Sequence, residues 1–404
     1  MTANVEDLLR LLAPQVLAVL VRRSGDFDSA EDAVQEALIA AADHWPREGV
    51  PEEPRGWLVA TARRRFVDQR RSEAARTSRE QRAVAEEAAH LDVSQEDDTL
   101  TLLFMCCHPL LSPTSAVALT LRAVGGLTTA EIARAYLVPE ATMAQRISRA
   151  KRSIKEAGAS FRTPAADQRP AAIRNVLRVL YLIFNEGYTA SSGESLVRPD
   201  LATEAIRLAR IVRDDLPDEA EAAALLALML LIDARRPARL DARGNLVPLA
   251  EQDRSRWDSA RIAEATAILD GAIGHGTVGE YQLQAAIASL HDHAARAEET
   301  DWPQIEALYG LLEDLTGNPV VTLNRAVAAS MAYGPQAGLA IVDRIEGPLT
   351  EHHRYLAVRG HLLEMSGDVG GAVTMYRLAA RQATNSAEQR HLQLRVARML
   401  TSAD

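Results

Sequence analysis

The chain has 404 residues and a formal net charge of −10 at pH 7. This length predicts two or three domains, and a composition rich in alanine, leucine, arginine and glutamate favours an all-α fold. No apolar run is long enough to span a membrane, and the first twenty residues lack the basic start and apolar core of a secretory signal. We therefore expect a cytoplasmic protein. The two cysteines are adjacent, which excludes a disulfide framework and a paired-cysteine metal motif.

Charge is distributed along the chain in blocks. Residues 1–54 carry four arginines and eleven acids, whereas residues 55–82 carry nine arginines and three acids. Residues 83–98 contain six acids and no base, which predicts an acidic linker. Blocks of this kind indicate separate faces with separate partners, so the overall negative charge does not exclude binding to nucleic acid.

Two helices are expected in the acidic N-terminal block. The first is amphipathic and covers residues 5–23. The second runs from about residue 29 to about residue 45, because the Ser29 hydroxyl can cap a helix that has Asp32 three residues later. Side chains three and four residues apart form one polar face of this helix: Asp32, Gln35 and Glu36. Without further context, a solvated surface is the plainer interpretation of that face.

A third long helix is expected over about residues 55–76, after a loop with three prolines. Leu58, Ala62 and Phe66 can face inward along it. Polar side chains, most of them arginines, occupy its outward face and flanks: Arg63, Arg64, Arg65, Asp68, Gln69, Arg70 and Arg71. Arginines at this density favour contact with phosphates or with a melted DNA strand.

Residues 127–155 match a helix-turn-helix. Thr128 and Glu131 can form a capping box at the start of a short first helix. Pro139 interrupts the pattern, and a second helix is expected from about Glu140. Its apolar stripe consists of Met143, Ile147, Ala150 and Ile154. Five basic side chains and no acid occur between residues 141 and 155, as in a helix that enters the DNA major groove. An ordinary amphipathic helix with a solvated basic face is the alternative.

The order of these segments resembles bacterial sigma factors of the extracytoplasmic-function (ECF) type. SAEDAVQEAL (29–38) is similar to region 2.2 of that family, PRGWLVATARRRFVDQRR (54–71) to regions 2.3 and 2.4, and the helix-turn-helix to region 4.2. One departure occurs in the turn, where Leu137 stands in place of a frequent glycine. The resemblance implies a region 2 domain over residues 1–82, the linker over 83–98, and a region 4 domain over 99–160.

The resemblance also implies partners and site residues. Region 2.2 binds core RNA polymerase in this family, which places Asp32, Gln35 and Glu36 on that interface. Regions 2.3 and 2.4 recognise and open the −10 element, so the polar residues of the third helix, from Arg63 to Arg71, are expected near promoter DNA. Region 4.2 reads the −35 element, which implies DNA contacts by Thr142, Gln145, Arg146, Arg149 and Lys151. No catalytic residue, cofactor or metal is expected, and the protein would not be an enzyme.

Residues 161–404 extend beyond a minimal sigma factor of this type. They hold 25 basic and 32 acidic residues, so a DNA-binding surface is not expected there. Tyr355–Ala383 fits the tetratricopeptide (TPR) spacing of small and aromatic residues, which predicts a TPR-like α-solenoid. A helix is expected to end at Gly187, and residues 241–258 are expected to form a loop of paired charges that packs as a salt-bridged plug.

The resemblance extends to the sigma factors that carry a fused TPR-like C-terminal domain, in which that domain is thought to modulate activity. We expect an intramolecular contact that either masks the DNA-binding arginines or assists polymerase. Two other hypotheses stay open at this stage. One is a conventional helix-turn-helix regulator with a helical sensor domain, which would act without sigma activity. The other is an enzyme within the C-terminal half.

Overall fold

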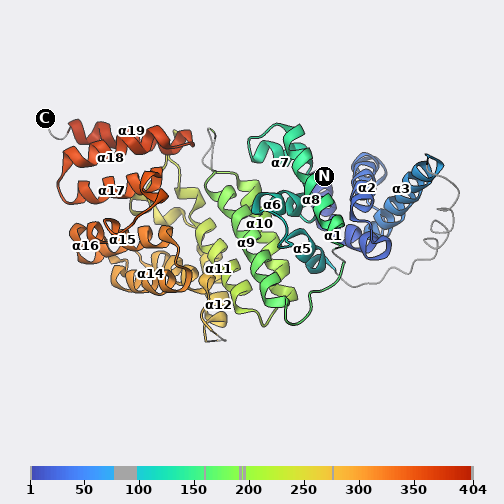
Figure 1. The fold of residues 1–404 in the computed structure, drawn as a ribbon, viewed down its shortest axis with the longest axis horizontal. Helices are drawn as coiled ribbons and strands as arrows, with labels where there is room; N and C mark the ends of the chain where they lie inside the picture. Colours follow the sequence, from blue (N-terminus) through green and yellow to red (C-terminus); the bar gives the residue numbers. More distant parts are fainter. Residues whose placement is uncertain are drawn as a thin grey trace. The chain divides into compact units, whose positions relative to one another are not determined.

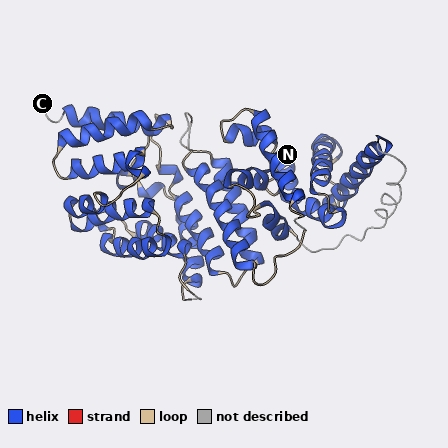
Figure 2. Ribbon diagram, in the orientation of Figure 1, coloured by secondary structure: helices blue, strands red, loops and turns tan. Residues whose placement is uncertain are grey.

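The computed structural model describes residues 2–76, 98–158, 161–190, 193, 197–274 and 277–401. It divides into two compact units, Met1–Leu182 and Ile183–Asp404, and both are built from helices (Figure 2). Within the described ranges there is no strand, only two isolated β-bridges. The all-α prediction is therefore confirmed. None of the helices in these ranges is long and apolar enough to cross a membrane.

The N-terminal unit begins with three long helices that all contact one another. They are α1 (Thr2–Ser24), α2 (Phe27–Glu48) and α3 (Pro54–Arg76) (Figure 1). Their shared core includes Val16, Leu17, Ala30, Ala37, Leu58 and Ala62. Trp57 of α3 packs edge-on against the buried Trp45 of α2, with 5.6 Å between the ring centroids. The helix that presents the arginines is thus held on a rigid support.

The start of α2 differs from the prediction. The helix begins at Phe27, and its N-cap is Asp26 and not Ser29. The Asp26 carboxylate accepts the Ser29 backbone N–H at 3.3 Å and the Ser29 hydroxyl at 2.8 Å. A carboxylate is favoured at this position because it meets unpaired N–H groups and the positive end of the helix dipole. Ser29 therefore supports the cap from inside the first turn.

Four shorter helices follow in the same unit. They are α5 (Thr99–Cys106), α6 (Pro113–Ala123), α7 (Thr129–Ala135) and α8 (Glu140–Glu156), and α6 contacts each of the other three. Their core includes Leu102, Leu103, Leu119, Leu121, Ile132 and Met143. Residues 83–97 of the predicted acidic linker lie outside the described residues. The next helix, α9 (Arg169–Tyr188), contains the boundary between the two units.

The C-terminal unit is a succession of helices that pack mainly on their neighbours in sequence. They are α10 (Pro199–Asp215), α11 (Ala220–Ala234), α12 (Ser259–Ala272), α13 (Glu280–His293), α14 (Trp302–Thr316), α15 (Pro319–Tyr333), α16 (Pro335–Val342), α17 (His353–Met365), α18 (Val369–Gln382) and α19 (Ser386–Thr401). Figure 1 shows α17, α18 and α19 side by side at the C-terminal end. Helix α11 is apolar and buried on nearly all sides, which fits its contacts with α10, α12 and α13.

The helix predicted to end at Gly187 ends one residue later. Helix α9 continues to Tyr188, and Gly187 has an ordinary helical conformation. Its small size matters because α10 crosses here: a Cβ on Gly187 would lie 2.3 Å from the backbone nitrogen of Ala202. The Gly187 carbonyl also accepts the backbone N–H of Arg198 at 2.7 Å. Close approach of two helices, and not a turn, is therefore the reason for this glycine.

We predict that Gly187→Ala destabilises the C-terminal unit, by about 1–3 kcal/mol, because the added methyl group forces two helix backbones apart. Gly271→Ala is the matched control. Gly271 lies in α12, where a Cβ meets no atom within 4 Å, and alanine there should stabilise by about 0.5–1 kcal/mol. Calorimetric unfolding of both variants checks the pair. Equal melting temperatures would contradict the close-approach role.

The loop 241–258 packs mainly through hydrogen bonds to backbone, and not as the predicted salt-bridged plug. Asp241 accepts two backbone N–H groups within the loop, and Asp258 caps α12. Arg254 donates to the carbonyl oxygens of His291 and Ala294, at 2.5 and 2.7 Å, and so joins the loop to the end of α13. Its guanidinium also lies over the ring of Trp257. Arg256 likewise donates to the carbonyl oxygen of Pro237.

Charged and aromatic side chains are buried together at the ends of α11 and α13. Arg235 donates to Asp292 at 2.6 Å and to the Ala288 carbonyl at 2.7 Å. His291 packs edge-on against Trp302. Burial lowers the pKa of His291 to about 3, and the positive charges of Arg235 and Arg254 act in the same direction. The histidine is therefore neutral in the folded protein.

We predict that the C-terminal unit loses stability as the pH falls below 6.5. Below that pH, His291 is protonated in the unfolded chain but stays neutral in the folded protein. The free energy of unfolding therefore falls by about 1.4 kcal/mol per pH unit until the pH reaches the pKa of His291 in the folded protein. Chemical denaturation between pH 7.5 and pH 5 measures this slope. His291→Phe removes the titrating ring and should make the slope shallower. An unchanged slope would show that other groups dominate.

Candidate nucleic-acid interface

The exposed face of α2 carries the three side chains predicted to meet core polymerase. The side chains of Asp32 and Glu36 are 54% and 58% exposed, and Gln35 is half-buried. Ile39, one turn farther along, is 64% exposed and adds an apolar side chain to the same face. Sequence reasoning did not select Ile39. The face therefore combines acids with an accessible hydrophobic side chain.

Arginines dominate the exposed side of α3. Of the predicted residues, Arg64, Arg65, Asp68 and Arg71 are exposed, whereas Arg63, Gln69 and Arg70 are half-buried. Two of these arginines reach acids of the preceding helices: Arg65 lies 3.6 Å from Glu36, and Arg70 lies 3.0 Å from Asp26. A surface with this density of guanidinium groups is suited to bind phosphates.

Asp26 has a second role beside its cap. Burial would raise the pKa of its carboxyl group, but the hydrogen bonds from Ser29 and the charges of Arg70 and Lys155 lower it instead. The carboxylate therefore stays ionised and fixes the direction in which Arg70 extends. Arg70 also lies over the ring of Phe66, with 5.5 Å from the guanidinium carbon to the ring centroid.

The helix-turn-helix is formed by α7 and α8. The Glu131 carboxylate accepts the backbone N–H of Thr128 at 2.7 Å, and the Thr128 hydroxyl oxygen accepts the backbone N–H of Glu131 at 3.2 Å. The predicted capping box is thus confirmed. Helix α8 begins at Glu140, as predicted, directly after Pro139.

Leu137 occupies the turn with a left-handed backbone. Its φ angle is +50°, and it is the one non-glycine residue with positive φ among the described residues. The backbone N–H of Val138 donates to the Ala133 carbonyl at 3.1 Å, which closes the end of α7. The family turn is therefore kept without its usual glycine, at a conformational cost that leucine bears. The side chain of Leu137 is 52% exposed.

Helix α8 has the buried stripe that its sequence predicts. Met143, Ile147, Ala150 and Ile154 are all buried. Of the predicted DNA contacts, Thr142, Gln145 and Arg149 are exposed, and Arg146 is half-buried. These four side chains lie on the solvent side of the helix. They are available to the edges of base pairs in a major groove.

Lys151 is placed differently from the other four predicted DNA contacts. Its side chain is only 9% exposed, and its ammonium group lies 2.7 Å from Glu31, 2.9 Å from Asp28 and 3.5 Å from Asp32. All three acids belong to α2. These carboxylates raise the pKa of Lys151 to about 12 although burial opposes the shift. In this structure, Lys151 therefore joins α8 to α2.

Sequence reasoning missed Glu31, which is the centre of this cluster. Its side chain is 2% exposed, and a second cation, Arg122 of α6, lies 2.8 Å from it. The sequence did contain an indication that Glu31 is buried, because it lies three residues before the buried Val34. Lys151 likewise lies four residues after Ile147 and three before Ile154. Both charges therefore occur at the spacing of core positions.

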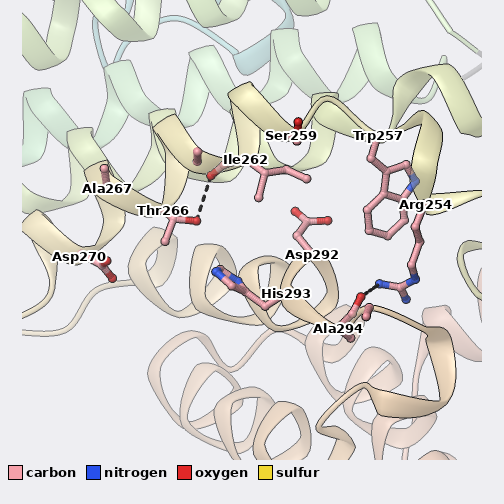
Figure 3. A pocket seen from close by; sticks show the side chains of 12 residues that line it. Arg254, Trp257, Ser259, Ile262, Thr266, Ala267, Asp270, Asp292, His293 and Ala294 are labelled. Atoms are coloured by element: carbon pink, nitrogen blue, oxygen red, sulfur yellow. Dashed lines mark hydrogen bonds between the residues drawn. The ribbon is translucent and has the colours of Figure 1, made fainter.

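A groove of about 630 Å³ lies between α12 and α13 in the C-terminal unit (Figure 3). Side chains of α12, among them Ile262 and Thr266, line one wall, and Asp292 and His293 line the other. Burial raises the pKa of Asp292, while Arg235 opposes the shift. That carboxylate is already paired with Arg235 at 2.6 Å, so its position serves the fold. Across the described residues, no group of three or more histidine, cysteine or acidic side chains could hold a metal ion.

Known proteins match both halves of the N-terminal unit. The sigma-70 region 2 family matches residues 8–76, and the sigma-70 region 4 family matches residues 101–154. The ECF RNA polymerase sigma factor SigL of Mycobacterium tuberculosis is 31% identical over 156 residues, which cover 37% of this chain and 87% of SigL. The chain belongs to the ECF RNA polymerase sigma factors. Its role is in transcription initiation, and its sigma-70 regions imply interaction with core RNA polymerase and promoter DNA.

The C-terminal half of this sigma factor matches a separate family, and one relative spans nearly the whole chain. Residues 172–273 match a family of unknown function, DUF6596. An uncharacterized protein of Rhizobium meliloti (strain 1021), R00370, is 43% identical over 396 residues, which cover 95% of this chain and 93% of that protein. No solved structure matches. The TPR-like character of this half therefore stays a prediction, as do the domain limits at residues 82, 98 and 160.

We predict that Leu137→Gly stabilises the region 4 half, by about 0.5–1 kcal/mol, because glycine adopts the left-handed conformation without steric cost. Leu137→Ala is the control. It removes the exposed side chain but keeps the strained backbone, so it should not stabilise. Thermal unfolding of the full chain, followed by circular dichroism, compares the three proteins. If Leu137→Ala raised the stability as much as Leu137→Gly, the increase would come from loss of the leucine side chain and not from relief of backbone strain.

Proposed function

We propose that this sigma factor directs core RNA polymerase to promoters defined by particular −10 and −35 elements, and that its helical C-terminal unit modulates this activity. The observation that carries the proposal is the pair of exposed faces within the two sigma-70 regions. One is the arginine side of α3, and the other is the solvent side of α8.

In this proposal, the exposed face of α2 binds polymerase. Asp32, Gln35 and Glu36 supply acids and an amide for a basic partner surface, and Ile39 supplies apolar contact area. Charges at the rim of such an interface mainly set the rate and specificity of association, whereas the apolar side chain adds buried area.

The arginine side of α3 acts on the −10 element. Opening a promoter requires the unstacking of several base pairs, at a cost of about 1–2 kcal/mol per step. Arg64 and Arg71, which are exposed, can neutralise the phosphates of the displaced strand and so offset part of that cost. Asp68 and Gln69 on the same side can accept and donate hydrogen bonds to an unstacked base.

The solvent side of α8 acts on the −35 element. Gln145 and Arg146 lie in the first half of the helix, which enters the major groove most deeply in helix-turn-helix proteins. Arginine favours guanine there, and glutamine favours adenine, because each forms two hydrogen bonds with that base. Thr142 and Arg149 complete the predicted contact surface. Polymerase, and not this subunit, carries out bond formation.

Modulation by the C-terminal unit is supported by two observations. The unit has its own extensive core, centred on α11, so it can act as a rigid body. The similarity to R00370 also extends over nearly the whole of both chains, so the two units occur together in that relative. Two directions of modulation are open: the unit inhibits by masking the α3 arginines, or it activates by assisting polymerase.

The test is transcription by purified core polymerase on fragmented genomic DNA, with the 5′ ends of the transcripts mapped. The full chain is compared with a chain that ends at residue 168, before α9, once circular dichroism has shown that the shortened chain is folded. Start sites shared by both would support promoter selection by the N-terminal unit, and their relative yield gives the sign of modulation. No start sites from either would favour a helix-turn-helix regulator without sigma activity.

We predict that the double variant Asp32→Arg, Glu36→Arg loses polymerase binding by at least tenfold, because two acids of the interface become cations. Asp43→Arg, Glu48→Arg is the matched control, with the same charge change on the exposed far end of α2. Polymerase affinity is measured by fluorescence anisotropy of the labelled sigma factor. Equal affinity for both double variants would exclude this face of α2 as the interface.

A further inference from the structure

One oxygen of the Asp292 carboxylate serves the fold, and the other does not. The Oδ1 atom accepts from Arg235 at 2.6 Å, whereas the Oδ2 atom is buried and has no hydrogen-bond partner among the described residues. The whole side chain is 0% exposed. Burial raises the pKa of Asp292 in spite of the opposing charge of Arg235, so that arginine alone does not replace the lost hydration. The carboxylate therefore retains an acceptor that a second donor can satisfy.

Asp292 borders the groove between α12 and α13. Figure 3 shows its side chain pointing from α13 toward Ile262 of α12, with Arg254 toward one end of the groove and Asp270 toward the other. Among the described residues that line the groove, Arg254 is the one lysine or arginine. Its guanidinium is already committed to two helix-end carbonyls and to a tryptophan ring. The stretch between Asp292 and Asp270 is therefore lined by carboxylates at both ends and by no arginine or lysine.

The polar side chains along this stretch offer acceptors. Thr266 donates its hydroxyl to the Ile262 carbonyl at 2.9 Å, so only its oxygen lone pairs are left for a ligand. The Nδ1 atom of His293 lies 2.8 Å from the Ser289 carbonyl. A neutral imidazole that donates there keeps Nε2 as an acceptor. Asp270 is exposed and adds a second carboxylate. A ligand that fits this stretch must supply the donors.

The shape of the groove suits a narrow apolar chain between two such donors. Alanines line both of its walls: Ala263, Ala267, Ala294 and Ala295. Asp270 follows Ile262, the residue that Asp292 faces, by eight positions in α12. At about 1.5 Å per residue, this separation is about 12 Å along the helix axis. A row of methylene groups of that length can pack against the alanines while its two ends approach the two carboxylates.

We propose that the groove between α12 and α13 binds a linear aliphatic diamine or polyamine. One ammonium group pairs with Asp270, and the other donates to Oδ2 of Asp292. The Asp292 carboxylate turns toward the groove to meet it, and Oδ2 has no hydrogen bond that such a turn would break. The methylene groups lie on the alanines of both walls. This inference does not rest on the proposed function, because the groove contains none of the residues assigned to polymerase or DNA.

Isothermal titration calorimetry of the full chain, at about 0.15 M salt, tests the site. The probe is octane-1,8-diamine, which is long enough to reach both carboxylates. It should bind about tenfold more tightly than butane-1,4-diamine, which reaches only one. The uncharged octane-1,8-diol should give no measurable binding. Equal affinity for the two diamines would overturn a site with two ends. Absence of binding by the long diamine would overturn the proposal and leave a buried water as the partner of Oδ2.

Variants of the groove separate specific binding from general attraction, because a chain with a net charge of −10 attracts any diamine. Ala267→Leu fills the groove at an exposed position and changes no charge, and it should weaken binding of the long diamine about tenfold or more. Asp270→Asn should weaken it about fivefold and remove the preference for the longer probe. Asp314→Asn is the matched control, since this exposed acid of α14 does not line the groove.

Asp292 is kept in all variants, because its loss would leave Arg235 buried without a counter-charge. The melting temperature of each variant shows that the C-terminal unit is folded. Ala267→Leu and Asp270→Asn act through different physical causes, one by volume and the other by charge, so each tests the site without the other. Wild-type affinity in either folded variant would assign the binding to the acidic surface as a whole and overturn the groove as the site.

Discussion

A carboxylate removed from water needs a positively charged partner. The N-terminal unit is arranged around a buried carboxylate, that of Glu31, which has two such partners. Glu31 meets Lys151 and Arg122, which belong to different helices of region 4. The pairing fixes where α6 and α8 lie against α2, since a displacement of either helix would leave a buried charge alone. Helix α1 also contacts α5 and α6 across the same boundary.

Helix α2 acts more generally as the acidic counterpart of the basic helices. Glu36 and Asp26 contact arginines of α3, and Asp28, Glu31 and Asp32 contact Lys151 of α8. The negative net charge of the chain is therefore compatible with nucleic-acid binding, because acids and bases are segregated by helix.

The C-terminal unit follows different physical rules. Its central helix α11 is apolar on nearly every side, and α9 and α10 approach each other closely at Gly187. Arg254 of the loop 241–258 satisfies carbonyl oxygens at the end of α13.

The sequence by itself determined the features that depend on neighbours in the chain. The capping box of Thr128 and Glu131, the apolar stripe of α8 and the helical class of both halves follow from local spacing, and each is present. The motifs that resemble ECF sigma factors were readable for the same reason. Their predicted site residues fall on the exposed or half-buried faces of α2, α3 and α8, with Lys151 as the exception.

Tertiary structure decided what depends on residues far apart in the chain. Glu31 and Lys151 are 120 residues apart, so nothing local indicates that each is the other's partner. The role of Gly187 likewise depends on where α10 crosses α9. Burial and pairing of charges are set by what packs against them, and a single chain segment does not contain that information.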